Sequence, residues 1–262
     1  MVDTHTHILP ALDDGAQSME QSLQMVRIAV KDGIRQMIAT PHVIGGLYEN
    51  KKEDILTAVA QLNTRLQEEG IPLTILPGAE YRLEPDLAQR LKGGELLTLN
   101  ESGRYLLVEL PDTFLPDFTA DVLYQIQLAG VTPIIAHPER NIVLSQEPAQ
   151  LAAFIGRGMA IQVTTGSVRG RFGQQAQKTS RHLIKEGLVH IVASDAHSPS
   201  GRTPRLEVTR QLISELYGPE TSRILLQDNP RRICQGQELI NPPPVQQSFW
   251  NQLRKVWTRK KA

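Results

Sequence analysis

The sequence predicts an α/β barrel built from seven strand–helix units. Short apolar runs alternate with longer amphipathic stretches along most of the 262 residues. Several of the runs are almost continuously apolar, as expected for parallel strands whose two faces are both covered. Glycine recurs just past the amphipathic stretches, where it ends helices at little steric cost. Seven such units in one chain favour a barrel, and a doubly wound open sheet is the alternative.

The predicted elements follow in chain order. The strands are Val2–Leu9, Gln36–Thr40, Leu73–Leu76, Tyr105–Leu110, Thr132–Ala136, Ala160–Thr164 and Leu188–Ala193. The helices are expected near residues 18–32, 50–69, 85–92, 117–129, 146–157, 172–186 and 204–217. Gly130, Gly158 and Gly187 follow three of these helices at nearly equal spacing, close to the length of one strand–helix unit.

The composition changes near residue 240. We expect residues 1–240 to form the barrel domain and residues 241–262 to form a C-terminal extension. Its Pro-rich start, Asn241–Pro244, predicts a stiff extended linker, because proline cannot continue a helix interior. The following residues, 245–262, combine basic side chains with apolar residues at helical spacing. This pattern predicts an amphipathic tail helix that docks on the barrel, self-associates, or contacts a kinase or a membrane surface.

Charge and composition exclude several classes of protein. The chain has 28 Lys and Arg and 28 Asp and Glu, so its neutral balance gives no support to nucleic-acid binding. The single cysteine, Cys234, rules out an intramolecular disulfide and favours a reducing compartment. No apolar run approaches the roughly 20 residues that span a bilayer, and the N-terminus does not resemble a signal peptide. We therefore expect a cytoplasmic protein, with peripheral membrane contact only through the tail.

Candidate metal ligands collect at the carboxyl ends of the predicted strands. The first strand carries His5 and His7, and the last leads into Asp195 and His197. Residues two apart on a strand point to the same face, and the strand ends of a barrel meet at one mouth. The candidate ligands are His5, His7, Asp14, His42, Glu80, Glu109, His137, Asp195 and His197. The remaining histidines, His182 in a helix and His190 at the opposite strand parity to Asp195, are predicted to be structural, with His190 facing the helix layer.

Five imidazoles and four carboxylates without a thiolate suit several borderline or hard divalent ions, such as Mn, Fe, Zn or Mg. Three such ions would more than neutralise the carboxylates, attract phosphate dianions and lower the pKa of bound water toward about 7. Arg140, three residues after His137, and Arg202 are the candidate catalytic contacts to phosphate oxygens. The alternative for each arginine is a surface ion pair.

These blocks together resemble the PHP (polymerase and histidinol phosphatase) family, and within it the bacterial manganese-dependent protein-tyrosine phosphatases of the CpsB/YwqE type. They occur in order over residues 3–204. The C-terminal extension with its two tryptophans departs from the family pattern. The matching blocks are Asp-Thr-His5-Thr-His7-Ile-Leu-Pro-Ala-Leu-Asp-Asp14-Gly, Ala-Thr-Pro-His42, Gly-Ala-Glu80, Val-Glu109-Leu-Pro, Ala-His137-Pro-Glu-Arg140, and Ser-Asp195-Ala-His197 with Arg202-Thr-Pro.

The resemblance implies a distorted (β/α)7 TIM-like barrel, the PHP fold, with a site for three metal ions, most often Mn. It implies that one ion is held by His5, His7, Glu80 and Asp195. Glu80 would bridge to a second ion held by Glu109 and His137, and the third would bind Asp14, His42 and His197. It also implies removal of phosphate from the tyrosine-rich tail of a bacterial autokinase that controls capsular or exopolysaccharide synthesis.

The predicted activity is metal-assisted hydrolysis of phosphotyrosine by an activated water. The phenol leaving group has a pKa near 10, so it needs only modest acid assistance, and no residue is assigned as general acid. The cysteine-phosphatase route needs Cys-x5-Arg, whereas Ile240 stands six residues after Cys234. The alternatives are a small-molecule phosphatase of the histidinol-phosphatase type and a metal-stabilised scaffold that binds a kinase without turnover. An amidohydrolase is disfavoured, because the fourth strand ends in Glu109 rather than lysine.

Overall fold

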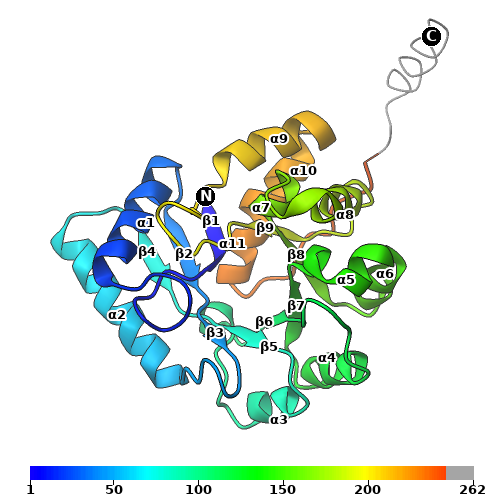
Figure 1. Ribbon diagram of the computed structural model, residues 1–262, viewed down its shortest axis with the longest axis horizontal. Coiled ribbons are helices and arrows are strands. Elements are labelled where there is room, and N and C mark those ends of the chain that lie inside the picture. Colours follow the sequence, from blue (N-terminus) through cyan, green and yellow to red (C-terminus); the bar gives the residue numbers. More distant parts are fainter. Residues whose placement is uncertain (246–262) are drawn as a thin grey trace, which may run out of the picture.

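Parallel strands form the centre of the computed structural model, which describes residues 1–245, and helices flank them on the outside (Figure 1). One group of strands pairs in the order β1-β2-β4 and the other in the order β3-β5-β6-β7-β8-β9, and every pairing is parallel. The strands are β1 (Val2–Thr6), β2 (Gln36–Ala39), β3 (His42–Val43), β4 (Thr74–Leu76), β5 (Glu80–Arg82), β6 (Tyr105–Glu109), β7 (Thr132–Ala136), β8 (Ala160–Thr164) and β9 (Ile191–Ala193).

Proline interrupts the second and third strands of the barrel. The sequence predicted single strands at Gln36–Thr40 and Leu73–Leu76, but each is followed by a proline and a further short strand, β3 or β5. Proline has no N–H to donate to a ladder, so regular pairing stops at Pro41 and Pro77. The chain nevertheless stays in line, since Glu80 N donates to Pro41 O at 3.0 Å. The pairs β2/β3 and β4/β5 therefore each serve as one distorted barrel strand.

The barrel is closed between its first and last strands. Asp195 N donates to His5 O at 3.0 Å, and His7 N donates to Ala196 O at 2.8 Å. These bonds join the end of β1 to the segment that follows β9. The two strand groups thus share one ring, and the closure lies among residues predicted to bind metal.

The helices occupy the regions expected from the sequence, with additional short ones between them. Helix α1 begins after Ser18, whose side chain accepts a bond from Gln21 N as an N-cap. The short helices α5, α7, α10 and α11 were not predicted, because a few residues are too short to show helical periodicity. The α-helices are α1 (Met19–Lys31), α2 (Lys52–Glu68), α3 (Leu87–Lys92), α4 (Thr119–Leu128), α5 (Ile142–Gln146), α6 (Pro148–Gly156), α7 (Thr165–Val168), α8 (Gly173–Lys185), α9 (Glu207–Tyr217), α10 (Pro219–Arg223) and α11 (Asn229–Cys234). Two short 3₁₀ turns, η1 (Leu99–Glu101) and η2 (Pro138–Arg140), and a π-helical turn, η3 (Ile224–Asp228), complete the set.

The barrel interior changes from apolar to polar along its strands. In β6, Tyr105 and Leu107 belong to an apolar cluster distinct from the one that holds Leu106 and Val108. The side-chain period of two therefore places Tyr105, Leu107 and finally Glu109 on the inner face. The same alternation applies to the neighbouring strands. The apolar residues that fill the amino end of the barrel include Ile38, Tyr105, Leu107, Ile134, Ala160 and Ile191.

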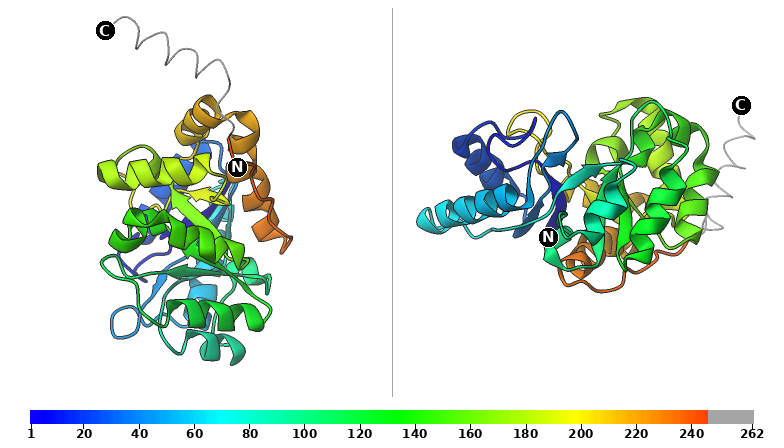
Figure 2. Two further views of the ribbon diagram at one scale, coloured as in Figure 1. Left: turned by 90° about the vertical axis from the view of Figure 1, so that its right-hand side faces the viewer. Right: turned by 90° about the horizontal axis from the view of Figure 1, so that it is seen from below.

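The segment after α11 covers the amino end of the barrel, opposite the loops that follow β1 and β9 (Figure 2). Tyr105 donates its hydroxyl to Gln237 O, and Val245 N donates to Lys185 O at 2.8 Å. The predicted linker Asn241–Pro244 therefore runs along the barrel surface. The tail helix predicted within 245–262 lies almost wholly outside the described residues, and the domain division at residue 240 stays a prediction. Within residues 1–245, no helix is both long and apolar enough to cross a membrane.

Candidate metal centre

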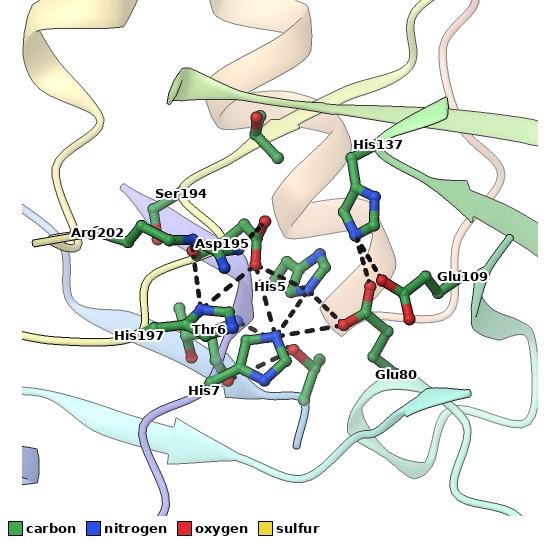
Figure 3. Close-up of polar contacts among 12 residues, drawn as sticks. His5, Thr6, His7, Glu80, Glu109, His137, Ser194, Asp195, His197 and Arg202 are labelled. Atoms are coloured by element: carbon green, nitrogen blue, oxygen red, sulfur yellow. Dashed lines mark hydrogen bonds and ion pairs between the residues drawn. The ribbon is translucent and has the colours of Figure 1, made fainter. Parts of the chain in front are cut away.

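The nine side chains predicted as metal ligands lie together at the carboxyl ends of the strands, and Figure 3 shows most of them. They come from β1, β3, β5 and β6 and from the segments that follow β1, β7 and β9. His137 and Asp195 adopt left-handed backbone conformations, with φ of 32° and 53°. Such conformations are unfavourable for residues other than glycine, by about 1 kcal/mol or more, and they collect at functional sites.

The first group of donors has the geometry of a tetrahedral cation site. The Nε2 atoms of His5 and His7 lie 3.2 Å apart, and Glu80 Oε2 lies 3.2 and 3.3 Å from them. Asp195 Oδ1 lies 3.5 Å from each of the same two nitrogens. Four ligands about 2.1 Å from a central ion would form a tetrahedron with edges of about 3.4 Å. The spacing of these four atoms therefore fits one metal ion.

Two further groups surround the first. His137 Nε2 lies 2.8 Å from Glu80 Oε1 and 3.7 Å from Glu109 Oε1, so Glu80 presents one oxygen to each of two neighbouring positions. On the other side, Asp14 Oδ1 lies 3.4 Å from His197 Nε2 and 3.6 Å from His42 Nε2. The shared position of Glu80 agrees with the bridging role that the sequence predicted.

Three buried ligand atoms have no hydrogen-bond partner within the described part of the chain. They are Glu80 Oε2, His42 Nδ1 and His197 Nε2. More than nine in ten buried polar groups in folded proteins do find such a partner. Lone pairs that converge in this way without donors are the arrangement that cation coordination requires, so these residues fit a metal.

Two side chains orient the first pair of histidines. Asp13 Oδ2 lies 2.6 Å from His7 Nδ1, and Gln162 Oε1 lies 2.9 Å from His5 Nδ1. Both acceptors require the proton on Nδ1, which leaves Nε2 of each ring as a lone-pair donor toward the centre. Sequence reasoning missed both residues. The signal for Gln162 is a polar residue in the middle of the otherwise apolar buried strand β8.

Burial and charge set the protonation of the ligands. Burial opposes ionisation of Glu80, but the neighbouring His5 and His137 hold its pKa well below the usual range. Burial lowers the pKa of His42 to about 4, and a hydrogen bond from His197 lowers the pKa of Asp14 to about 2. Near pH 7 these groups are therefore in the forms that bind metal, namely carboxylate and neutral imidazole.

His7 differs from the other ligands. Burial opposes its protonation, but the carboxylate of Asp13, joined by those of Asp195 and Glu80, raises its pKa well above the ordinary value. A cation bound at Nε2 would take the place of that proton. Metal binding should therefore release protons and strengthen as pH rises.

Both predicted arginines reach the centre through Asp195. Arg140 and Arg202 each pair with Asp195 Oδ2, whereas the other oxygen, Oδ1, is the one that approaches the histidines. Their guanidinium carbons lie 4.0 and 5.6 Å from the ring centroid of Phe172, within the range of cation–π contacts. Phe172 lies in the loop after α7, and no sequence pattern marked it. The arginines are thus partly buried at the centre, which differs from the surface ion pairs that were their alternative.

The two remaining histidines lie outside the centre, as predicted. The side chain of His182 is half exposed on α8. His190 is buried at the amino end of β9, where its Nδ1 accepts from Ile161 N and its Nε2 bonds to Asn241 Oδ1 at 3.0 Å. His190 therefore contacts the C-terminal segment, and both roles are structural.

A parallel barrel with this cluster of imidazoles and carboxylates at its mouth has the architecture of a metal-binding barrel hydrolase. Residues 1–235 match the family model described as capsular polysaccharide synthesis, CpsB/CapC, and the chain belongs to this family. The fold class and the family resemblance predicted from the sequence are confirmed.

Individual relatives cover nearly the whole chain. Tyrosine-protein phosphatase YwqE of Bacillus subtilis (strain 168) is 39% identical over 244 residues, which are 93% of this chain and 95% of that protein. Tyrosine-protein phosphatase CpsB of Streptococcus pneumoniae is 32% identical over 244 residues, covering 90% and 99%. A crystal structure from work on YwqE and CpsB, described there as unique metal-dependent tyrosine phosphatases, superposes with a TM-score of 0.88 at 39% identity, over 94% of this chain and 100% of that one.

Proposed function

We propose that this member of the CpsB/CapC family is a metal-dependent protein-tyrosine phosphatase that acts in capsular or exopolysaccharide synthesis. The observation that carries the proposal is the convergence of nine imidazole and carboxylate ligands at one barrel mouth, with two arginines beside them. Full-length similarity to proteins named as tyrosine phosphatases supports it. The same ligands without thiolate argue for phosphoryl chemistry assisted by cations rather than by a cysteine.

The ligand groups suit three divalent ions. His5, His7, Glu80 and Asp195 would hold the first, and Glu80 would bridge to a second held with Glu109 and His137. The third would bind Asp14, His42 and His197. The donor set favours Mn, with Fe, Zn or Mg as alternatives. When bound, such ions activate water and neutralise the charge of a phosphoryl group.

The protein side chains supply positioning and charge. Asp13 and Gln162 hold the imidazoles of His7 and His5 in the tautomer that exposes Nε2. Arg140 and Arg202 lie where their guanidinium groups can exchange Asp195 Oδ2 for phosphoryl oxygens, which they bind with charge-assisted hydrogen bonds. The phenolate of tyrosine leaves without an assigned acid, because its conjugate acid has a pKa near 10.

The proposed substrate is the phosphotyrosine-bearing tail of a bacterial tyrosine kinase, dephosphorylated in the cytoplasm. Contact with the membrane or with a second copy through residues 245–262 is part of the same proposal, since that segment is basic and carries apolar residues at helical spacing. The alternative small-molecule activity, on a substrate such as histidinol phosphate, makes a different prediction about substrate choice.

The test is a turnover assay on the purified full chain. The protein is dialysed against EDTA, and hydrolysis of a phosphotyrosine peptide and of histidinol phosphate is measured before and after Mn²⁺ is added. We expect EDTA to abolish activity, Mn²⁺ to restore it, and the peptide to be the better substrate. Full activity after EDTA would contradict the metal mechanism, and a preference for histidinol phosphate would establish the alternative.

Substitution of the bridging ligand tests the assignment of the residues. Glu80→Ala should lower kcat by about 100-fold or more, because both neighbouring ligand groups lose an oxygen. Glu215→Ala, which removes an exposed carboxylate on α9, is the matched control and should leave turnover unchanged. Near-wild-type turnover by Glu80→Ala would contradict the ligand assignment.

A further inference from the structure

A pocket of about 360 Å³ opens beside the candidate metal centre. Its walls come from the segments that follow β6, β7 and β8. The residues that give it its character are Asp112, Glu139, Arg140, Ile142, Phe172 and Ala176. Strand β8 contributes no predicted metal ligand, and the loop after it supplies Phe172 instead.

Arg140 belongs both to this pocket and to the metal centre. Its Nη2 atom pairs with Asp195 Oδ2, and the other carboxylate oxygen, Oδ1, lies 3.5 Å from the Nε2 atoms of His5 and His7. Only one carboxylate therefore separates the Arg140 guanidinium from the proposed metal ligands. A phosphoryl group held by Arg140 would have the pocket as its immediate neighbour.

The chemistry of the pocket favours an uncharged ring over a second anion. Ile142, Phe172 and Ala176 provide apolar wall, and Ile142 is 49% exposed. Asp112 and Glu139 place carboxylates around the same space, which would repel another phosphate or carboxylate. An aromatic ring attached to the phosphoryl oxygen matches this combination.

The pocket walls are held in place by the surrounding structure. Glu139 Oε1 accepts from Thr164 N at 3.0 Å, and Ile142 N donates to Asp112 O at 2.8 Å. The ring of Phe172 rests against Gly166, since a Cβ at position 166 would lie only 2.4 Å from its Cε2 atom. The shape is therefore preorganised, which reduces the entropic penalty of binding.

Two buried polar atoms on these walls find no partner within residues 1–245. They are Arg140 Nε and Glu139 Oε2. A donor and an acceptor in this state, on side chains that line the pocket, suit the polar backbone of a bound peptide.

We propose that this pocket receives the phenyl ring of the substrate phosphotyrosine together with its adjoining backbone, while Arg140 contacts the phosphate. The proposal rests on the phosphatase function above and adds the site that distinguishes tyrosine from smaller phosphate esters. Ile142, Phe172 and Ala176 are the residues that contact the ring, and Ile142 is the one whose truncation disturbs the fold least, because it is half exposed.

Binding of two non-hydrolysable analogues tests the proposal on the Mn²⁺-loaded full chain. Phenylphosphonate carries the ring and methylphosphonate lacks it, and calorimetry gives the affinity of each. We expect the wild type to favour phenylphosphonate, and Ile142→Ala to weaken phenylphosphonate by about tenfold while leaving methylphosphonate unchanged. Leu128→Ala is the matched control, since Leu128 is 59% exposed at the far end of α4, next to the start of β7.

The outcomes separate this proposal from the function on which it rests. Equal weakening of both analogues, or no weakening of either, would overturn the ring pocket. The binding comparison does not depend on turnover. A wild type that shows the expected ring preference but does not hydrolyse phosphotyrosine would therefore contradict the proposed function and leave the pocket supported.

Discussion

Replacement of Asp13 by asparagine should weaken metal binding without removing any proposed ligand. Asp13 Oδ2 accepts from His7 Nδ1 at 2.6 Å and from His42 N at 2.9 Å, and its Oδ1 accepts from Gly15 N at 2.9 Å. Asparagine has one acceptor oxygen and one amide donor. In either orientation its NH₂ group would face a donor that the carboxylate now satisfies.

The least unfavourable response is a change of tautomer at His7. If the amide of the introduced asparagine donates to His7 Nδ1, the imidazole proton moves to Nε2, the atom expected to bind metal. Loss of such an orienting partner typically lowers metal affinity by about 10- to 100-fold. That range corresponds to about 1.4 to 2.7 kcal/mol. The proposed ligand atoms themselves all remain.

The assay is calorimetric titration of Mn²⁺ into the EDTA-treated protein, combined with phosphatase activity at rising Mn²⁺. Asp13→Asn should need about 10- to 100-fold more Mn²⁺ for half-maximal binding and activity, and excess Mn²⁺ should recover most of the turnover. Asp32→Asn is the control, because Asp32 Oδ2 alone caps α9 through Leu206 N and Glu207 N, which an amide oxygen can also do. A wild-type Mn²⁺ titration curve for Asp13→Asn would refute the tautomer argument.

Three other outcomes are expected. Gly166→Ala should raise KM for a phosphotyrosine peptide about threefold, because its Cβ displaces Phe172 and weakens the Phe172–Arg140 contact; an unchanged KM would contradict that role. Burial lowers the pKa of His190, so the unfolded chain binds more protons and stability should fall as pH drops through about 6.5. In urea titrations at several pH values, His190→Gln should lose part of that decline, whereas an identical pH profile would exclude His190 as its source. Mn²⁺ at about 100 times its Kd should stabilise the protein by about 2.7 kcal/mol, and a melting temperature unaffected by Mn²⁺ would count against a bound metal.

The sequence predicted those parts of the fold that depend on local patterns. Each long helix and each barrel strand lies within a few residues of its predicted position, because burial of a regular face imposes a period of 3.6 or 2. The splitting of two strands was missed, although Pro41 and Pro77 carried the signal. Short helices such as α10 and α11 contain too few turns for a periodic pattern.

For the candidate site, strand ends were informative and loops were not. The nine candidate ligands were found because parallel strands bring their carboxyl ends to one mouth. Asp13 was overlooked beside Asp14, and Gln162 was read only as part of an apolar strand. The contact of Phe172 with both arginines depends on a loop path that neither periodicity nor residue type predicts.

The position of the closing seam has a consequence for how the molecule stays folded. Ser194 N donates to Asp3 Oδ1 across 191 residues of chain, immediately below the level where His5 and Asp195 present their ligand atoms. An ion gripped from both sides of that seam would work as a clasp between the two ends of the barrel. Because closing so long a loop carries a large entropic penalty, chelation should loosen the outermost strands first, and they should then exchange their amide hydrogens sooner than β6 and β7 in the middle of the sheet.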